Sequence, residues 1–254
     1  MAQESRSIVV LSPEVAEILV AIGAEDRIVG VTEECTYPEV LLSKPRVGKF
    51  GLLDRERIIS LKPALIFASA LEQEGLAGEF SRLGYRVETV YPRSLAEMIS
   101  EIRRIGEIVD MAESANALAD SLAMEIARIK MAADLRGAKP RVYLEIYRDP
   151  LMSVSDQSFV GELIETAGGD NIFPTLERDY ARIKAEDVVS ARPDIIICYS
   201  HDTLDNILNR KGWSNIPAIQ TQSIYFESDI DPDLIQRAGP RAIQGMQILA
   251  EIFA

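Results

Sequence analysis

Few side chains of the kinds that carry catalysis or metal binding are present in this sequence. His201 is the only histidine, and Cys35 and Cys198 are the only cysteines. One histidine excludes a histidine-rich metal site or a pair of histidines acting as acid and base, and two cysteines are too few for the usual zinc cluster. His201 follows a predicted strand, where it either binds a metal or cofactor or forms hydrogen bonds in a solvated loop. Gly-rich nucleotide-binding loops and the G-x-S-x-G nucleophile motif are absent, so the sequence favours binding over catalysis.

Two glutamates occupy matching places in an internal repeat. Segment 56–67 matches segment 186–197, and Glu56 aligns with Glu186 at the start of both. A second, shorter match recurs in the same order, which favours a duplicated fold over chance. Each glutamate lies in the first turn of a short predicted helix. There the two carboxylates either complement the helix dipole, by about 0.3–1 kcal/mol each, or present matched anions to a two-fold symmetric partner.

Strands alternating with helices predict the architecture that positions these residues. The first and last thirds of the chain both show this alternation, which is typical of a parallel sheet covered by helices. The middle third has almost no Gly or Pro and a helical spacing of apolar residues. We therefore predict an α/β protein with two Rossmann-like lobes of mainly parallel sheet, joined by one long connecting helix. The N-terminal lobe is predicted at 1–93, the helical segment that includes the connecting helix at 94–138, and the C-terminal lobe at 139–254. The alternative is a single sheet with one more surface helix.

Local signals give individual element boundaries. Ser12 and Pro13 are typical of an N-cap and a first helical position, and Gly23 is typical of a helix end. The other predicted elements are a helix at 71–83, helices divided near 110–113, a long helix at 115–135, a strand with its turn at 216–226, and a last helix at 233–253 interrupted at 239–240.

Two lobes would enclose a cleft, and ligands of α/β proteins bind at the carboxyl ends of the strands. The segments expected there are 12–13, 34–37, 69–70, 148–149 and 199–201. Several aromatic residues fall at or near predicted loops: Tyr37, Phe50, Phe173, Tyr180 and Tyr199. These rings either line the cleft for a large ring-bearing ligand or cap the local core. Trp213 is predicted to be a packing residue.

Composition excludes several classes of protein. The chain has 254 residues, 47% apolar and 26% charged, which is typical of a folded protein. Its net charge of −13 argues against nucleic-acid binding. No apolar run approaches the roughly 18 residues of a membrane helix. The first residues lack a signal peptide, so either the protein is cytosolic or its leader was removed.

Motifs along nearly the whole chain resemble one family. They are Tyr37-Pro38, Pro45-Arg46-Val47-Gly48, the Glu56 and Glu186 segments with Pro63 and Pro193, the segment 168–173 and Arg237-Ala238-Gly239-Pro240-Arg241. Their order resembles the substrate-binding proteins of ABC importers for vitamin B12, ferric siderophores and haem. The resemblance implies a ligand held between two lobes, a monomer without enzymatic activity, cofactor or metal, and a periplasmic or membrane-anchored extracytoplasmic location after removal of the leader. It also implies that Glu56 and Glu186 dock onto arginines of the dimeric permease.

Within this family, the sequence is most similar to cobalamin-binding members. The resemblance assigns ligand contacts to Tyr37, Phe50, Ser69, Phe173, Tyr180, Asp233 and Arg237, and we add Arg148 and His201 as candidates. Ser69, Phe50 and Tyr180 stand where a well-studied member has tryptophans, which changes the shape of the pocket.

Other functions stay open at this point. A ferric-siderophore or haem protein is the main alternative, because Arg148, Arg182 and Arg237 suit an anionic chelate. Lys49 stands where haem-binding members often have a ligating tyrosine, which disfavours haem. More remote alternatives are a metal-dependent α/β enzyme that uses His201 and a cytosolic sensor of the same ligand.

Overall fold

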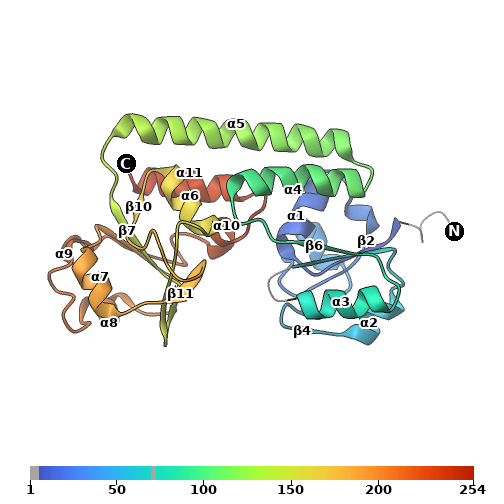
Figure 1. The fold of residues 1–254 in the computed structure, drawn as a ribbon, viewed down its shortest axis with the longest axis horizontal. Coiled ribbons are helices and arrows are strands. Elements are labelled where there is room, and N and C mark those ends of the chain that lie inside the picture. Colours follow the sequence, from blue (N-terminus) through green and yellow to red (C-terminus); the bar gives the residue numbers. More distant parts are fainter. Residues whose placement is uncertain (1–5, 70–72) are drawn as a thin grey trace. The chain divides into compact units, whose positions relative to one another are not determined.

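The chain folds into two compact units, each built around its own parallel sheet (Figure 1). The computed structural model describes residues 6–69 and 73–254. The N-terminal unit lies within Met1–Pro92, Ala96–Leu122 and Ala238–Pro240, and the C-terminal unit comprises Arg93–Leu95, Ala123–Arg237 and Arg241–Ala254. The predicted α/β class with mainly parallel sheets is confirmed. The lobe limits at 93 and 138, and the cleft between lobes, stay predictions.

The N-terminal unit contains a four-stranded sheet, a small hairpin and helices on both faces of the sheet. Its elements are β1 (Ile8–Val10), α1 (Pro13–Ala21), η2 (Glu25–Arg27), β2 (Ile28–Val31), η3 (Glu39–Ser43), β3 (Gly48–Lys49), β4 (Leu52–Leu53), α2 (Arg55–Ser60), β5 (Leu65–Ser69), α3 (Glu74–Arg82), β6 (Val87–Val90) and most of α4 (Leu95–Ile108). The strand order is β2-β1-β5-β6, all parallel. Figure 1 shows α3 on one side of this sheet and α1 and α4 on the other. Because both faces are covered, β1 and β5 are fully buried, and all their residues except Ser69 at the end of β5 are apolar.

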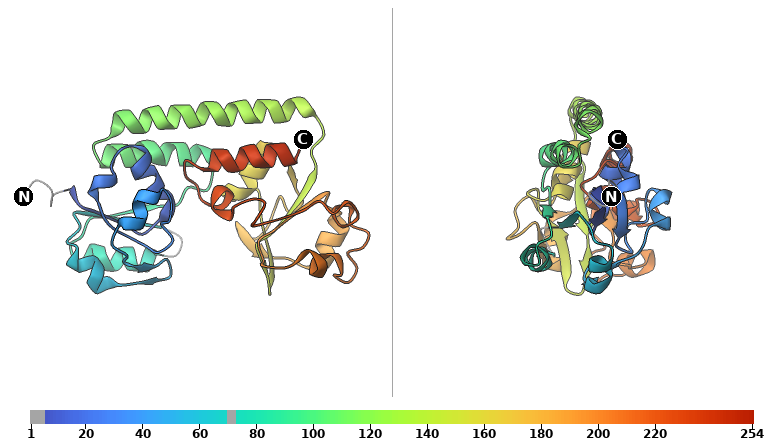
Figure 2. Two further views of the ribbon diagram at one scale, coloured as in Figure 1. Left: turned by 180° about the vertical axis from the view of Figure 1, so that it is seen from behind. Right: turned by 90° about the vertical axis from the view of Figure 1, so that its right-hand side faces the viewer.

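The C-terminal unit has the same sheet order and an additional antiparallel sheet. Its elements are β7 (Arg141–Glu145), β8 (Tyr147–Arg148), β9 (Leu151–Val154), α6 (Phe159–Ala167), β10 (Asp170–Asn171), β11 (Tyr180–Arg182), α7 (Ala185–Ala191), β12 (Ile195–Cys198), α8 (Leu204–Leu208), α9 (Pro217–Thr221), β13 (Ile224–Phe226), α10 (Pro232–Gln236) and α11 (Ala242–Ile252). The parallel order β10-β7-β12-β13 repeats the N-terminal order strand for strand, and β11-β9-β8 forms the antiparallel sheet. The view from behind in Figure 2 shows the red helix α11 beside α6 on one side of the parallel sheet.

The internal repeat corresponds to matching structure in the two units. Helix α2 precedes the central strand β5, and α7 precedes its counterpart β12. At the matching positions after these helices, Lys62 and Arg192 both have a positive φ, of 47° and 51°. A left-handed residue ends a helix, and the proline that follows prevents its continuation. The repeat therefore encodes a complete helix–turn–strand unit.

The helical segment between the two alternating regions divides as predicted. Helix α4 ends at Ile108, Asp110 has a φ of 54°, and α5 (Ala112–Arg136) then continues for 25 residues. At 1.5 Å per residue this is a helix of roughly 37 Å. Residues up to Leu122 belong to the N-terminal unit and residues from Ala123 to the C-terminal unit, so α5 contributes to both.

Two local predictions differ from the structure, and a third cannot be compared with it. Ser12 occupies the N-cap position of α1, but its side chain makes no capping bond and its Oγ is buried without a partner among the described residues. The segment 216–226 contains the short helix α9 before its strand, because Pro217 stands at the first helical position and Gln222 ends the turn in a left-handed conformation. Helix α3 is described from Glu74, and the start predicted at 71 lies outside the described residues. The predicted interruption of the last helix is confirmed by the break between α10 and α11.

Candidate binding sites

In the N-terminal unit, the loop that carries Phe50 is held by two polar side chains. The Phe50 N–H donates to the carboxylate of Glu34 at 3.0 and 3.1 Å, and the Phe50 carbonyl accepts from Gln73 Nε2 at 3.3 Å. Gln73 is 2% exposed, and it also bonds the Leu11 carbonyl at 3.1 Å and the Ser69 N–H at 2.8 Å. Gln73 thus ties the ends of β1 and β5 to the Phe50 loop. The half-buried Phe50 ring is positioned by this backbone network.

The other two N-terminal candidates differ in accessibility. Tyr37, in the loop after β2, is 44% exposed and offers a large aromatic surface to solvent. Ser69, the last residue of β5, is only 3% exposed. Tyr37 is therefore accessible to a ligand in the described conformation, whereas contact with Ser69 would require its covering residues to move.

Glu56 and Glu186 occupy the same position of their helices. Each is the second residue of its helix, after Arg55 in α2 and after Ala185 in α7. Both are exposed, and neither carboxylate has a hydrogen-bond or ion-pair partner among residues 6–69 and 73–254. Because no hydrogen bond or ion pair within these ranges uses the two carboxylates, both are available to another molecule.

The aromatic candidates of the C-terminal unit lie in the sheets and beside the core. Phe173 packs edge-on against the buried Tyr143, with ring centroids 6.1 Å apart. Tyr180 lies in β11 opposite Val154, in a strand where a loop was expected. Tyr199 is 5% exposed, and burial raises its pKa well above the ordinary value. Phe173 and Tyr180 are both partly accessible, whereas Tyr199 is a core residue.

Asp233 and Arg237 form an i, i+4 ion pair, with Asp233 Oδ1 2.9 Å from an Arg237 nitrogen. Arg241 approaches the other oxygen of Asp233 at 3.9 Å. Burial raises the pKa of Asp233 although both arginines oppose this shift. The side chains of Asp233 and Arg237 are partly exposed, at 34% and 18%, so the carboxylate can accept hydrogen bonds from a polar ligand and the guanidinium can donate them.

His201 lies in an exposed turn after β12. Its side chain is 84% exposed and its Nδ1 is 3.0 Å from Glu227 Oε1. Within the part of the chain that the structure describes, no three His, Cys, Asp or Glu side chains are grouped so as to hold a metal ion. His201 is thus a solvent-exposed side chain beside the carboxylate of Glu227, and its contact with a ligand stays a prediction.

A buried polar network not anticipated from the sequence underlies the surface of the C-terminal unit. Glu145, at the end of β7, is fully buried and accepts from Arg210 at 2.7 Å and from Ser200 at 2.5 Å. Arg210 also bonds Asp202 at 2.8 Å, and its guanidinium lies 4.5 Å from the ring centre of Trp213. Trp213 is 2% exposed, which confirms its predicted packing role.

Asp202 links the network to the surface. Its side chain is 1% exposed and bonds Arg210, Asn206 and the half-exposed Arg148. Burial opposes ionisation of Asp202, but hydrogen bonds from Arg210 and Asn206 outweigh it, so the pKa of Asp202 lies below its ordinary value. The carboxylate is therefore ionised and fixes both guanidinium groups.

This pKa shift predicts an acid-sensitive contribution to stability. Because the pKa of Asp202 is lower in the folded protein than in the unfolded chain, its stabilisation is present above the unfolded value of about 3.9 and is lost as the pH falls below it. We expect the stability of Asp202→Asn to depend less steeply on pH between pH 5 and pH 2 than that of the native protein, measured by urea denaturation. Asp134→Asn, a change at an exposed position of α5, is the control and should leave the pH dependence unchanged. An Asp202→Asn profile parallel to the native one would contradict the assignment.

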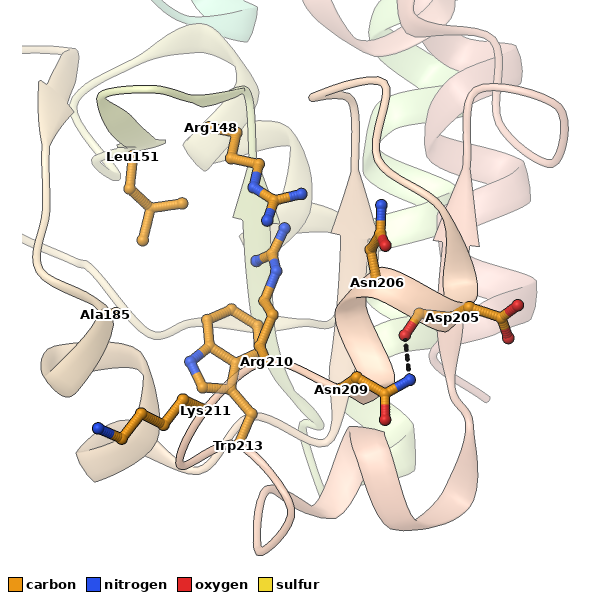
Figure 3. A pocket seen from close by; sticks show the side chains of 9 residues that line it. All are labelled: Arg148, Leu151, Ala185, Asp205, Asn206, Asn209, Arg210, Lys211 and Trp213. Carbon is orange, nitrogen blue, oxygen red and sulfur yellow. Dashed lines mark hydrogen bonds between the residues drawn. The ribbon is translucent and has the colours of Figure 1, made fainter.

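A pocket of about 640 Å³ opens above this network (Figure 3). Its lining residues come from the β8–β9 hairpin, the start of α7, α8 and the loop after it: Arg148, Leu151, Ala185, Asp205, Asn206, Asn209, Arg210, Lys211 and Trp213. Figure 3 shows the Arg148 and Arg210 guanidinium groups close to each other, with Leu151 and Trp213 as apolar neighbours. Of the sequence-predicted contacts, only Arg148 lies here. One feature of the sequence could have indicated this site. It is Glu145, an acidic residue at the otherwise apolar end of β7.

Comparisons with known proteins agree with the duplicated fold. The sequence profile described as "Periplasmic binding protein" matches residues 8–229. The chain belongs to this family. It is 30% identical over 256 residues to an uncharacterized ABC transporter substrate-binding lipoprotein of Bacillus subtilis, a match that covers 98% of this chain and 80% of the relative. It is 25% identical over 254 residues to the vitamin B12-binding protein of Vibrio vulnificus, covering 97% and 89% of the two chains.

A solved relative has the same fold. The periplasmic heme-binding protein of Roseiflexus superposes with a TM-score of 0.85 at 25% identity, covering 98% of this chain and 97% of that one. The predicted membership among substrate-binding proteins of the vitamin B12, siderophore and haem type is thus confirmed. No helix in the described ranges combines the length and apolar composition that a membrane span needs.

Proposed function

We propose that this protein is an extracytoplasmic, non-enzymatic binding protein that captures a corrinoid and delivers it to an ABC importer. The observation that carries the proposal is the match to proteins named for vitamin B12 binding over nearly the whole chain. The candidate contacts supply chemistry that suits a corrinoid. Tyr37 and Phe50 offer aromatic surface for an apolar macrocycle, and Asp233 with Arg237 offers hydrogen bonds for its polar periphery.

Haem or a ferric siderophore is the second candidate. It is favoured by the similarity of the fold to a heme-binding protein and by the exposed cation Arg148, which suits an anionic ligand. The ionised carboxylate of Asp202 beside Arg148 reduces the net positive charge available there. The corrinoid is therefore our first choice, because its recognition relies less on net charge.

Thermal unfolding with a ligand panel distinguishes these candidates. A ligand present at 100 times its dissociation constant stabilises the fold by about 2.7 kcal/mol, which for a chain of this size raises the Tm by roughly 5–10 °C. We expect cyanocobalamin to raise the Tm by this amount, and haemin or a ferric catecholate to have little effect. If haemin alone raises the Tm, the second candidate replaces the first.

A tyrosine variant tests the predicted contact directly. Tyr37→Ala should weaken cyanocobalamin binding by roughly two- to tenfold, because it removes one exposed aromatic contact of about 0.5–1.5 kcal/mol. Tyr147→Ala is the control, since Tyr147 is similarly exposed, at 55%, and is not a candidate contact. Equal affinities of the two variants, measured by isothermal titration, would remove Tyr37 from the site.

Delivery requires a second surface, which we assign to Glu56 and Glu186. Both are exposed anions at equivalent helix positions, and a permease made of two identical subunits presents the same basic surface twice. The matched glutamates of a monomeric binding protein fit such a two-fold partner.

A further inference from the structure

The pocket beside α7 presents positive charge to solvent. Lys211 is exposed and has no hydrogen-bond or ion-pair partner among the described residues. Arg148 is 49% exposed and pairs only with Asp202 in the described part of the chain. The remaining donors of Arg148 and the ammonium of Lys211 are thus available to another molecule.

The acids that balance these cations lie beneath them. Glu145 and Asp202 are 0% and 1% exposed, so they hold the guanidinium groups in place but cannot be reached from outside. One acid, Asp205, belongs to the lining itself, and Figure 3 shows its carboxylate turned away from Arg148 and Arg210. The lining thus carries three cations, Arg148, Arg210 and Lys211, against one acid, so the charge exposed to solvent in the pocket is mainly positive, although the whole protein has a net charge of −13.

This pocket adjoins the proposed docking residue Glu186. Ala185 lines the pocket and immediately precedes Glu186 in α7. A partner that binds Glu186 with its own cations would bring positive charge next to Arg148 and Lys211 and would shield both from water. Arg148 keeps Asp202 as its counter-ion, but Lys211 would be buried without one; such burial is strongly unfavourable, and so is a like-charge contact across an interface. Such a partner needs a carboxylate at this place.

We propose that the pocket receives an acidic side chain of the permease, next to the contact made by Glu186. This inference rests on the proposed function. Docking of the C-terminal unit then uses two contacts of opposite sign: Glu186 binds a cation of the permease, while Lys211 and Arg148 bind an anion. Leu151 and Trp213 line the same pocket, so an apolar residue beside the permease carboxylate is accommodated as well.

Lys211 is the position to change, because no hydrogen bond or ion pair among the described residues depends on it. We expect Lys211→Glu to weaken binding to the importer by at least about tenfold, and Lys211→Ala to weaken it less. Binding is measured by biolayer interferometry on the importer that supports ligand uptake by this protein, held in lipid nanodiscs. Lys130→Glu is the matched control, since Lys130 is an exposed lysine of α5 without a partner among the described residues. It carries the same charge change and should weaken binding by no more than about twofold.

A charge swap identifies the partner group. Acidic residues on the periplasmic face of the permease are changed to lysine one at a time, and one of these variants should restore binding of Lys211→Glu. The inference fails if Lys211→Glu binds as well as Lys130→Glu, or more tightly than the native protein, while Glu186→Lys still weakens binding. If Glu186→Lys has no effect, or the native protein binds no importer, the proposed docking function itself is wrong. Melting temperatures and ligand affinities of all variants should equal the native values.

Discussion

The double variant Glu56→Lys/Glu186→Lys is expected to abolish transport of the ligand and to leave ligand affinity unchanged. Both carboxylates are exposed and have no partner among the described residues, so their replacement breaks no internal contact. A lysine in the first turn interacts unfavourably with the helix dipole, but this costs only about 0.3–1 kcal/mol for each substitution. At the interface, in contrast, each reversal places like charges together, which costs several kcal/mol. Uptake into proteoliposomes that contain the importer and titration of the free protein measure the two properties separately.

Helix α5 provides a matched control for this experiment. Glu113 is the second residue of α5, as Glu56 and Glu186 are of their helices, and it is exposed without a partner in the described ranges. Glu113→Lys therefore repeats the effect on a helix dipole without changing a proposed docking residue. It should transport at the native rate. If this control is equally inactive, or if the double variant loses ligand affinity in parallel with transport, the docking assignment is contradicted.

The repeat made the topology predictable because it encodes local structure. A helix of six or seven residues, a left-handed residue at Lys62 or Arg192, a proline and a buried strand follow one another in both copies. Each of these features depends on neighbours in the chain, so it can be read from the sequence. The two sheets then have the same strand order. The helix at 217–221 was missed because its signal, a proline at the first position, is equally typical of a turn.

The polar networks could not be predicted because they join distant segments. Gln73 connects Leu11, Phe50 and Ser69, and Glu145 meets Arg210 across 65 positions of the chain. No periodicity or spacing relates such residues, and polar side chains in loops usually lie in solvent. The sequence left two roles open for Tyr199, lining the cleft or capping the core, and its burial directly after β12 agrees with the second.

Truncation of Arg210 is expected to lower the free energy of unfolding strongly, because a buried polar network depends on this residue. Arg210 bonds Glu145 and Asp202, which are almost completely buried. Arg210→Ala leaves Asp202 with Arg148 and leaves Glu145 without a counter-charge among the described residues. Removal of one partner from a buried ion pair typically costs 3–5 kcal/mol. We expect a loss of about this size in the free energy of unfolding, measured by urea denaturation and followed by circular dichroism. Trp213 fluorescence should change as well, because the guanidinium over its ring is lost.

An arginine in an exposed ion pair serves as the control that separates the effect of burial from the loss of an ion pair as such. Arg128 pairs with Glu125 on α5 at 2.9 Å, but their side chains are 59% and 39% exposed, so Arg128→Ala should cost less than 1 kcal/mol. Adding Glu145→Gln to Arg210→Ala should recover part of the lost stability, because a neutral amide is less costly to bury than an unpaired carboxylate. If Arg210→Ala costs no more than Arg128→Ala, water reaches Glu145 and Asp202 and the network is not a buried one. In that case the pocket above it loses the fixed guanidinium groups on which its charge depends.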